Sequence, residues 1–251
     1  MGREMVEVAD GVLVATSRRE LTTSTVVRDN GTTLLVDPAW EPDELEALAD
    51  FLEEGGLTVS AGFATHSHHD HILWHPGFGG APRWATRGTA DTVAEHRGEL
   101  LEFLGPDWPM QLMPLVGQVH PVPQTDPTTL PWPGPHIEIV EHDGHSTGHG
   151  ALWMPGTRVL LAGDMLSDVE LPMTDETGLA AYDQALTILE PYVRQAAVLV
   201  PGHGHPTGSP LERWTADRRY LDAVLAGDEA DDPRLTNPGM VQVHAANLTG
   251  R

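Results

Sequence analysis

The stretch THSHHDHILW, residues 65–74, places four histidines and one aspartate within six consecutive positions: His66, His68, His69, Asp70 and His71. Imidazole and carboxylate groups are strong ligands for transition metals, so the cluster predicts a metal site in preference to a merely solvated loop. Alternation and turn geometry can direct His66 and His68 one way, and Asp70 and His71 another. The spacing therefore predicts two adjacent ligand sets and two metal ions.

The cluster directly follows a short apolar strand predicted over residues 58–64, and α/β folds usually place ligands at the carboxyl ends of strands. Three further turns stand beside predicted apolar strands: DGHSTGH at 143–149, AGD at 162–164 and PGHGH at 201–205. Their glycines let the backbone approach a compact site closely, while the strand behind each turn fixes the position of the ligand. We therefore expect these turns to contribute to the same site.

Hydrophobic patterning predicts strand-rich stretches and helices that alternate in both halves of the chain. Strands are predicted over residues 11–15, 24–28, 32–36, 137–141, 151–154, 158–162 and 196–200, and helices over 41–54, 89–104, 178–192 and 210–226. Two helix-covered sheets packed face to face fit this order. The length of 251 residues suits a single domain over 1–251, with an acidic C-terminal tail at 227–251.

Residues 105–136 form a proline-rich insertion with nine prolines, a density that predicts irregular structure. Such a segment is a surface connection or a lid over a substrate pocket. In the lid hypothesis, the pocket is walled by Trp108, Met110, Leu112, Met113 and Trp132. The helix predicted over residues 210–226 likewise has two interpretations, a core-facing helix or a dimer contact. Both rest on its apolar positions Leu211, Trp214, Leu221 and Leu225.

The elements HxHxDH, GHSTGH, AGD and PGHG, in this order, resemble the metallo-β-lactamase superfamily from residue 11 to about residue 210. The resemblance implies an α+β fold, a four-layer αβ/βα sandwich of two mixed β-sheets packed face to face with helices outside. It also implies a dinuclear site at one edge of the sheets. Carried over by position, it assigns His66, His68 and His145 to the first metal and Asp70, His71 and His203 to the second. Asp164 would bridge the two metals.

Several residues near these motifs have open roles. His149 stands four positions after His145, but the glycines around it argue against a helix, so His145 is the expected ligand. His205 is an alternative to His203, and His69 has no ligand role in the family pattern. Asp37 ends a predicted strand, where it either supports the metal loops or caps the following helix.

Composition narrows the chemistry of the site. The chain holds 14 basic residues, all of them Arg, against 37 acidic ones, so its formal net charge is −23. Cys is absent, which removes disulfides, thiolate ligands and cysteine nucleophiles, and the lack of Lys removes a Schiff-base mechanism. The expected cofactors are two divalent metal ions, zinc in first place and iron or manganese as alternatives. A His at position 68, where redox di-iron members of the family often have Glu, favours zinc.

The expected function is a dinuclear metallo-hydrolase in which a metal-bridging hydroxide attacks a small-molecule ester, thioester or lactone. Asp70 would orient the hydroxide and pass a proton to the leaving group. Alternatives are a β-lactamase or phosphodiesterase, an iron-dependent oxidoreductase and a non-catalytic ligand-binding protein. The acidic chain disfavours nucleic acid and anionic membranes as partners. The lack of a signal sequence or long apolar run favours the cytoplasm, and the oligomeric state stays open, with a homodimer considered.

Overall fold

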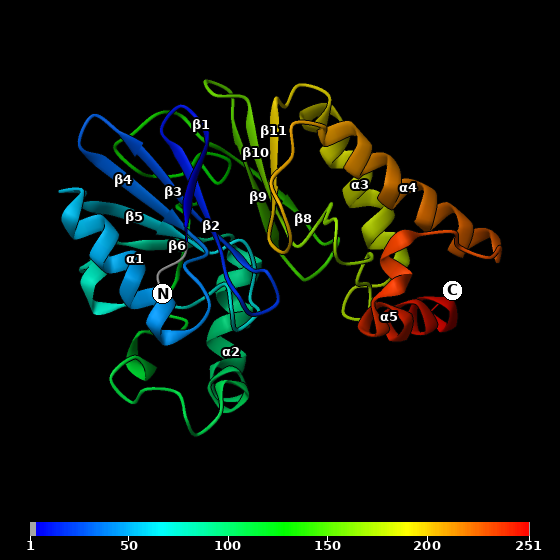
Figure 1. Ribbon diagram of the computed structural model, residues 1–251, viewed down its shortest axis with the longest axis horizontal. Helices are drawn as coiled ribbons and strands as arrows, with labels where there is room; N and C mark the ends of the chain where they lie inside the picture. The colour runs from blue at the N-terminus through cyan, green and yellow to red at the C-terminus, as the bar shows by residue number, and fades with distance from the viewer. Residues whose placement is uncertain (1–3, 251) are drawn as a thin grey trace.

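Two β-sheets lie face to face in the computed structural model, which describes residues 4–250, and helices cover the outer faces (Figure 1). One sheet has seven strands in the order β1-β2-β3-β4-β5-β6-β7, and the other has four in the order β11-β10-β9-β8. Each sheet mixes antiparallel pairs with parallel ones, such as β4 with β5 and β10 with β11. The predicted four-layer sandwich of two mixed sheets is thus confirmed.

The strands of the larger sheet are β1 (Met5–Ala9), β2 (Val12–Thr16), β3 (Thr23–Asp29), β4 (Thr32–Val36), β5 (Val59–Phe63), β6 (Arg83–Ala85) and β7 (His120–Pro121). Those of the smaller sheet are β8 (Glu138–His142), β9 (His149–Met154), β10 (Val159–Gly163) and β11 (Val198–Pro201). The helices are α1 (Pro42–Glu54), α2 (Arg87–Leu104), α3 (Leu179–Val193), α4 (Pro210–Ala226) and α5 (Pro238–Thr249). None of these helices combines the length and apolarity needed to cross a bilayer.

Both faces of the central strands are buried, because successive side chains on a strand point to opposite faces of the sheet. On β2, Val12 and Val14 pack between the sheets, whereas Leu13 packs under the outer helices. On β10, Leu161 faces the other sheet, and Leu160 faces α3 and α4. This double burial explains why the strands read as continuous apolar runs and not as alternating ones.

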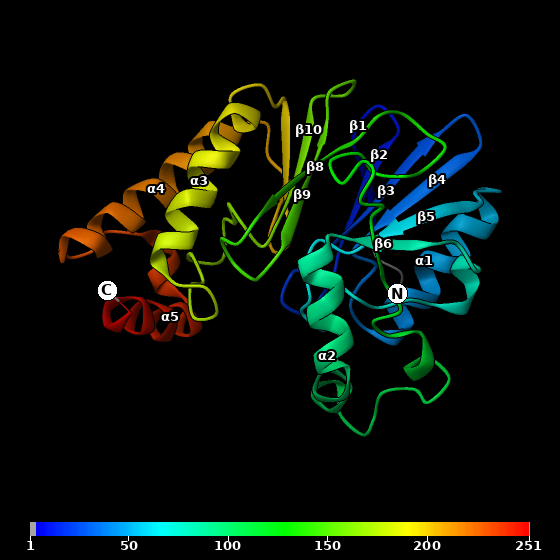
Figure 2. The ribbon, with the colours of Figure 1, turned by 180° about the vertical axis from the view of Figure 1, so that it is seen from behind.

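Helices α1 and α2 lie on the side of the larger sheet, and α3 and α4 cover the smaller one (Figure 2). At the start of α1, the buried Glu44 accepts a hydrogen bond from the N–H of Glu41 at 3.3 Å. The same carboxylate accepts hydrogen bonds from the Ser17 hydroxyl at 2.6 Å and the Arg18 N–H at 3.0 Å. Glu44 therefore fixes both the start of α1 and the loop between β2 and β3, which lies beside the candidate site.

Three short strands were not among the predicted elements. Strand β1 pairs only with β2 and is partly exposed, so its hydrophobic signal is weak. Strands β6 and β7 are three and two residues long, too short to give a periodic pattern. Because β7 and the 3-10 turn Met113–Leu115 lie inside residues 105–136, the expectation of wholly irregular structure there is wrong in these two places.

The segment expected as an acidic tail at 227–251 contains a 3-10 turn, Pro233–Thr236, and the helix α5. Its anchor is Arg234, whose buried guanidinium lies 2.6 Å from Asp217 of α4 and 2.8 Å from Asp232. Met240 of α5 is also buried and joins the core under α3 and α4. Only the first residues of the segment are acidic, and the remainder carries the anchors that fold it back.

The structure contradicts the lid hypothesis for residues 105–136. Trp108 and Leu112 are buried in the core beside α1 and α2, and Met110 is 85% exposed. None of the five proposed lid side chains lines the cavity at the candidate site. On α4, Leu221 is fully buried, whereas Leu211 and Leu225 are 42% and 49% exposed. The core-facing interpretation therefore holds for Leu221 and for Trp214, which packs against the same core, whereas Leu211 and Leu225 lie on the exposed side of the helix.

Candidate metal centre

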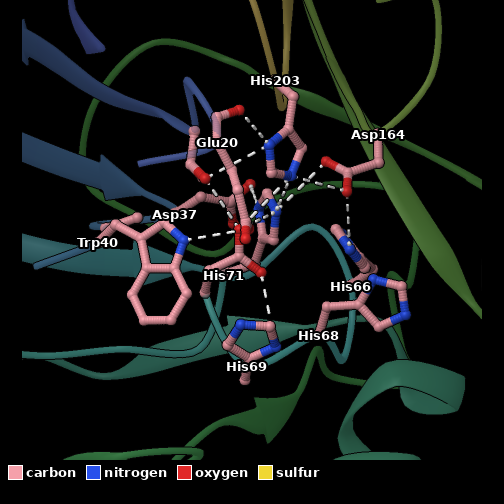
Figure 3. Close-up of polar contacts among 12 residues, drawn as sticks. Glu20, Asp37, Trp40, His66, His68, His69, His71, Asp164 and His203 are labelled. Atoms are coloured by element: carbon pink, nitrogen blue, oxygen red, sulfur yellow. Dashed lines mark hydrogen bonds and ion pairs between the residues drawn. The ribbon is translucent and has the colours of Figure 1, made fainter. Parts of the chain in front are cut away.

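Four turns from the two sheets meet at one edge of the sandwich. Residues 64–72 follow β5, residues 143–148 join β8 to β9, Asp164 follows β10, and His203 follows β11. In Figure 3 the side chains of His71, His203 and Asp164 point toward one another, while Trp40 and His69 lie at the margin. The structure brings all seven predicted residues together in two adjoining groups: His66, His68, His145 and Asp164, and Asp70, His71 and His203.

In the first group, three imidazoles surround one carboxylate oxygen. The Nε2 atoms of His66 and His145 lie 3.4 and 3.5 Å from Oδ2 of Asp164. The Nδ1 atom of His68 lies 3.0 Å from Nε2 of His145. These residues come from both sheets, so the group closes only when the sheets are packed together.

In the second group, the donor atoms are equally close. The Nε2 atoms of His71 and His203 lie 3.4 Å apart, and each is 3.4 Å from Oδ2 of Asp70. The same two nitrogens lie 3.3 Å from Oδ1 and 3.2 Å from Oδ2 of Asp164, respectively. Asp164 therefore contacts both groups and is placed to join them.

In the second group, the hydrogen-bond partners of the two Nδ1 atoms show which ring nitrogen of each histidine carries the hydrogen. Nδ1 of His71 lies 3.0 Å from the Asp37 carboxylate, and Nδ1 of His203 lies 2.9 Å from the Glu20 carbonyl oxygen. Because both partners are acceptors, each Nδ1 is the donor, which leaves a lone pair on each Nε2. Two such nitrogens 3.4 Å apart, beside carboxylates, suit a shared cation.

The first group follows the same rule. Nε2 of His68 lies 2.6 Å from the Glu176 carboxylate, so its Nδ1 presents a lone pair to the centre. Nδ1 of His66 lies 3.1 Å from the hydroxyl of Thr65, which itself donates to Asp37 at 2.6 Å and so accepts from the ring. Hydrogen bonds of this kind typically orient metal-binding histidines in proteins.

The donor set fits metal ions. Tetrahedral coordination with bonds of about 2.0–2.2 Å puts neighbouring donor atoms about 3.3–3.6 Å apart, and most separations in both groups fall in this range. Nε2 of His66 and Oδ1 of Asp164 are buried, and neither has a hydrogen-bond partner in the described part of the chain. Buried polar atoms are rarely left unpaired, so these atoms face a missing partner.

The electrostatics of the centre stabilise positive charge. Burial opposes ionisation of Asp70, but His71 and His203 outweigh it and hold the pKa of the carboxyl well below its usual range. Burial likewise opposes protonation of His203, yet Asp164, Glu170 and Asp70 together raise its pKa to about 10. In the first group, burial lowers the pKa of His145 to about 4, which keeps this ring neutral, as a metal ligand must be.

Asp37 supports the metal loops and does not cap α1, whose N-cap is Glu41. Its Oδ1 accepts from the N–H of Thr65 at 2.8 Å, and its Oδ2 contacts the Thr65 hydroxyl and the His71 ring. One buried carboxylate thus holds both ends of the loop that carries the histidine cluster. Of the two sequence interpretations, only support of the loops agrees with these contacts.

His149 lies behind the centre and points no atom into either group. Its Nε2 accepts a hydrogen bond from the N–H of Asp164 at 3.2 Å. Its ring stacks on the rings of His66 and His142, with distances between ring centroids of 5.1 and 4.6 Å. Gly163 has φ of +54°, and a Cβ there would strike the His149 ring. His149 therefore positions Asp164 from outside, so the choice of His145 over His149 agrees with the geometry.

Two other histidines lie outside both groups. His205 is exposed, and its ring pairs with Asp168 at 2.9 Å. His69 lines the cavity margin, where its ring contacts Trp40 and Phe103. Burial lowers the pKa of His69 to about 4, so it is a neutral wall residue.

Sequence reasoning missed four polar residues around the centre: Thr22, Glu20, Glu170 and Glu176. The Thr22 hydroxyl donates to Oδ2 of Asp70 at 2.9 Å, and Oε1 of Glu170 lies 3.8 Å from Nδ1 of His203. Burial raises the pKa of Glu170 to about 7. The signal that could have found them is their place in the sequence. Glu170 and Glu176 lie shortly after Asp164, in the loop between β10 and α3, and Thr22 directly precedes β3.

Comparison with known proteins places this geometry in a family. Residues 18–210 match the family model described as the metallo-beta-lactamase superfamily. An uncharacterised protein of Mycobacterium leprae (strain TN) is 26% identical over 196 residues, which cover 72% of this chain and 84% of that protein.

Solved structures share the fold at low sequence identity. A metallo-beta-lactamase from Pontibacter korlensis is 21% identical with a TM-score of 0.67, over 85% of this chain and 96% of that one. The metallo-beta-lactamase FIM-1 from Pseudomonas aeruginosa, solved in a mono-zinc form, is 16% identical with a TM-score of 0.68, over 88% and 96% of the two chains. At these identities the likeness extends to the fold.

Proposed function

The chain belongs to the metallo-β-lactamase superfamily, and we propose that it is a dinuclear metal-dependent hydrolase acting on a small-molecule ester, thioester or lactone. The observation that carries the proposal is the pair of adjoining donor groups that share Asp164. His66, His68 and His145 would hold the first ion, and Asp70, His71 and His203 the second. Zinc is the proposed metal, because the donors are imidazole and carboxylate without thiolate.

Two divalent cations would supply Lewis acidity, which makes water acidic enough to give hydroxide near neutral pH and polarises a substrate carbonyl group. The chain supplies the proton transfer. Oδ2 of Asp70 faces Thr22 and the ligand imidazoles, whereas Oδ1 lies 4.0 Å from its nearest described ionic partner, Nδ1 of His69. We assign Oδ1 to orienting the attacking water, accepting its proton and passing it to the leaving group.

The test combines metal analysis with a substrate panel. Protein purified without added metal is assayed for zinc, iron and manganese, then loaded with zinc and offered p-nitrophenyl esters, acyl thioesters, lactones, nitrocefin and bis-p-nitrophenyl phosphate. We expect two zinc ions per chain and turnover of an ester, thioester or lactone. Preferred cleavage of nitrocefin would indicate a β-lactamase, and preferred cleavage of bis-p-nitrophenyl phosphate a phosphodiesterase, in place of the proposed hydrolase. Two iron ions with oxygen uptake would indicate an oxidoreductase, and a fully loaded but inactive protein would indicate a non-catalytic role.

A further inference from the structure

A cavity of about 510 Å³ opens over the two donor groups, within the usual size range for small-molecule sites. One of its walls is shared by two segments: Val169 and Met173 come from the loop between β10 and α3, and Met240 comes from α5. Met240 lies beyond residues 18–210, the stretch that matches the family model. Part of this wall therefore belongs to the C-terminal segment, residues 227–250, which the family model does not include.

The C-terminal segment also holds the other part of the wall in place. The side chain of Asn247, on α5, is buried and donates to the carbonyl oxygen of Pro172 at 2.7 Å. Its Oδ1 accepts a hydrogen bond from the hydroxyl of Thr174 at 2.7 Å. These two contacts lie directly before and after Met173 in the chain. The position of Met173 in the wall therefore depends on Asn247.

Two further contacts join the same loop to the C-terminal segment. The guanidinium of Arg234 donates to the carbonyl oxygens of Ser167 and Glu170 at 3.0 and 2.8 Å. The sulfur of Met240 accepts a hydrogen bond from the N–H of Leu171 at 3.1 Å. The loop and α5 thus form one connected wall and not two independent segments.

The side chains that this wall presents are largely apolar. Val169 and Met173 are half-buried, Met240 is buried, and Leu21 adds an apolar side chain from the loop between β2 and β3. Burial of an alkyl or aryl group against such a surface is favourable, because it removes apolar area from water. The unbranched side chain of methionine also adapts to the shape of its neighbour.

The arrangement of the site indicates which part of a substrate lies against this wall. Asp70, which the proposed function assigns to protonating the leaving group, lines the cavity beside His69 in the loop after β5, a strand of the larger sheet. Figures 1 and 2 show α5 on the side of α3 and α4, which cover the smaller sheet, and away from α1. A leaving group near Asp70 therefore leaves the acyl group to lie against the loop and α5.

On the basis of the proposed function, we infer that the C-terminal segment builds the acyl-binding wall of this site. Met173 and Met240 are the specificity-determining residues, and they select esters, thioesters or lactones whose acyl group is apolar and longer than acetyl. Asn247 is a positioning residue, because it acts on the substrate only through the loop that carries Met173.

A series of p-nitrophenyl esters tests the inference on the zinc-loaded full chain. We expect kcat/KM, relative to the rate of each ester with hydroxide, to rise from acetate through butyrate to hexanoate, at least about tenfold in total. Met173→Ala should reduce the hexanoate-to-acetate ratio about tenfold, mainly by raising KM for the hexanoate. Met173→Leu conserves the apolar volume and should keep the ratio. An unchanged ratio in Met173→Ala would overturn the inference.

The positioning role of Asn247 is tested at its partner in the loop. Thr174→Val removes the hydrogen bond to Asn247, and we expect the hexanoate-to-acetate ratio to fall about threefold or more, through KM, with zinc content unchanged. Thr174→Ser keeps the hydroxyl and should restore the ratio. Thr177→Val is the matched control, since the hydroxyl of Thr177, in the same loop, has no hydrogen-bond partner among the described residues. If Thr174→Val behaves as Thr177→Val does, Asn247 has no positioning role.

Two alkyl hydroxamates separate this inference from the proposed function. Acetohydroxamic and hexanohydroxamic acids share one metal-binding group and differ only in the acyl chain, so their affinities, measured by calorimetry, report on the wall without turnover. We expect the hexanoyl compound to bind at least about tenfold more tightly, and Met173→Ala to abolish the difference. This result would support the inference even if no ester is hydrolysed, an outcome that contradicts the proposed function alone.

Equal affinities of the two hydroxamates would overturn the inference. A second contrary result concerns the leaving group. If Met173→Ala impairs hydrolysis of hexyl acetate relative to ethyl acetate and leaves the acyl series unchanged, the wall binds the leaving group, and its assignment to the acyl group is wrong.

Discussion

At the scale of single residues, the centre depends on groups that are not ligands themselves but hydrogen-bond to the ligand histidines from outside. Asp37 contacts both Thr65 and His71, and Thr65 in turn contacts the ring of His66, so one carboxylate orients histidines in both donor groups. Glu176 and the Glu20 carbonyl do the same for one histidine each. The order of the centre therefore depends on a network in which hydrogen-bond direction is fixed.

Replacing Asp37 with Asn should weaken metal binding without removing a proposed ligand. The amide keeps the size of the side chain but loses the negative charge that polarises the His71 ring, so we expect zinc affinity to fall about 10- to 100-fold. Competition with a chromophoric chelator measures the change. Asp50→Asn, on the exposed face of α1, is the control and should bind zinc as the parent does. Unchanged affinity in Asp37→Asn would contradict the role given to this carboxylate.

Replacing Asp70 with Asn tests the proposed proton transfer. The amide oxygen still provides a donor atom, but the group can no longer accept a proton, so turnover should fall about 10²- to 10⁴-fold. Metal content, measured by elemental analysis, should be retained in part. A variant that keeps near-parental kcat would rule out the assignment of Asp70 to proton transfer.

The sequence was enough to name the seven residues that meet in the centre, because their motifs resemble those of the metallo-β-lactamase superfamily and each motif follows a predicted strand. It did not reveal Glu170 or Glu176. Both lie in an irregular loop with no local period. Ser167 and Arg234 hold the backbone of Glu170, and Glu176 contacts His68. Supporting groups of this kind become visible only when distant segments are placed in space.

At the scale of elements, the central strands and the first four helices followed from hydrophobic patterning, since each buries a long apolar face. The partly exposed strand β1 and the two-residue strand β7 give no such pattern, and their pairing depends on the neighbouring strand. Helix α5 was missed because its sequence is weakly amphipathic and follows an acidic run. Its position rests on Arg234 and Met240 instead.

Helix α5 should set the acyl preference through Met240. Met240→Ala removes apolar surface from the wall, so kcat/KM for p-nitrophenyl hexanoate should fall about tenfold relative to that for the acetate. Met110→Ala is the matched control, because Met110 is 85% exposed in the proline-rich insertion and does not line the cavity. The opposite result is a ratio of kcat/KM, hexanoate to acetate, that changes in Met110→Ala and not in Met240→Ala. It would support the lid hypothesis for residues 105–136 and contradict a role of α5 in acyl preference.

At the scale of the whole molecule, the centre lies between two halves of the chain. His66, His68, Asp70 and His71 follow the larger sheet, and His145, Asp164 and His203 follow strands of the smaller one. Ions held by both sets would tie the sheets together. Binding to the folded chain alone then adds stability that depends on the concentration of free metal.

Removal of metal should therefore lower the melting temperature. At a free zinc concentration about 100 times the Kd, one site contributes about 2.7 kcal/mol, which corresponds to a shift of roughly 5–10 °C for a chain of this size. Calorimetric scans of chelator-treated and zinc-reloaded protein measure the shift. His203→Ala should lose the part of the zinc-dependent increment that the second ion contributes, about half of the total, whereas His205→Ala, at an exposed position, should keep all of it. A melting temperature indifferent to zinc would show that the ions do not join the sheets.

The wide separation in sequence of the groups around His203 also bears on how the protein is made. His71 and His203 are 132 residues apart, and the carbonyl that orients His203 lies 183 residues before it, on Glu20. During synthesis the early histidines leave the ribosome long before Asp164 and His203 exist to complete either group. Neither donor group is complete before Asp164 or His203 has been made. An ion held by a whole group would therefore be one that is available once nearly the full chain has been synthesised.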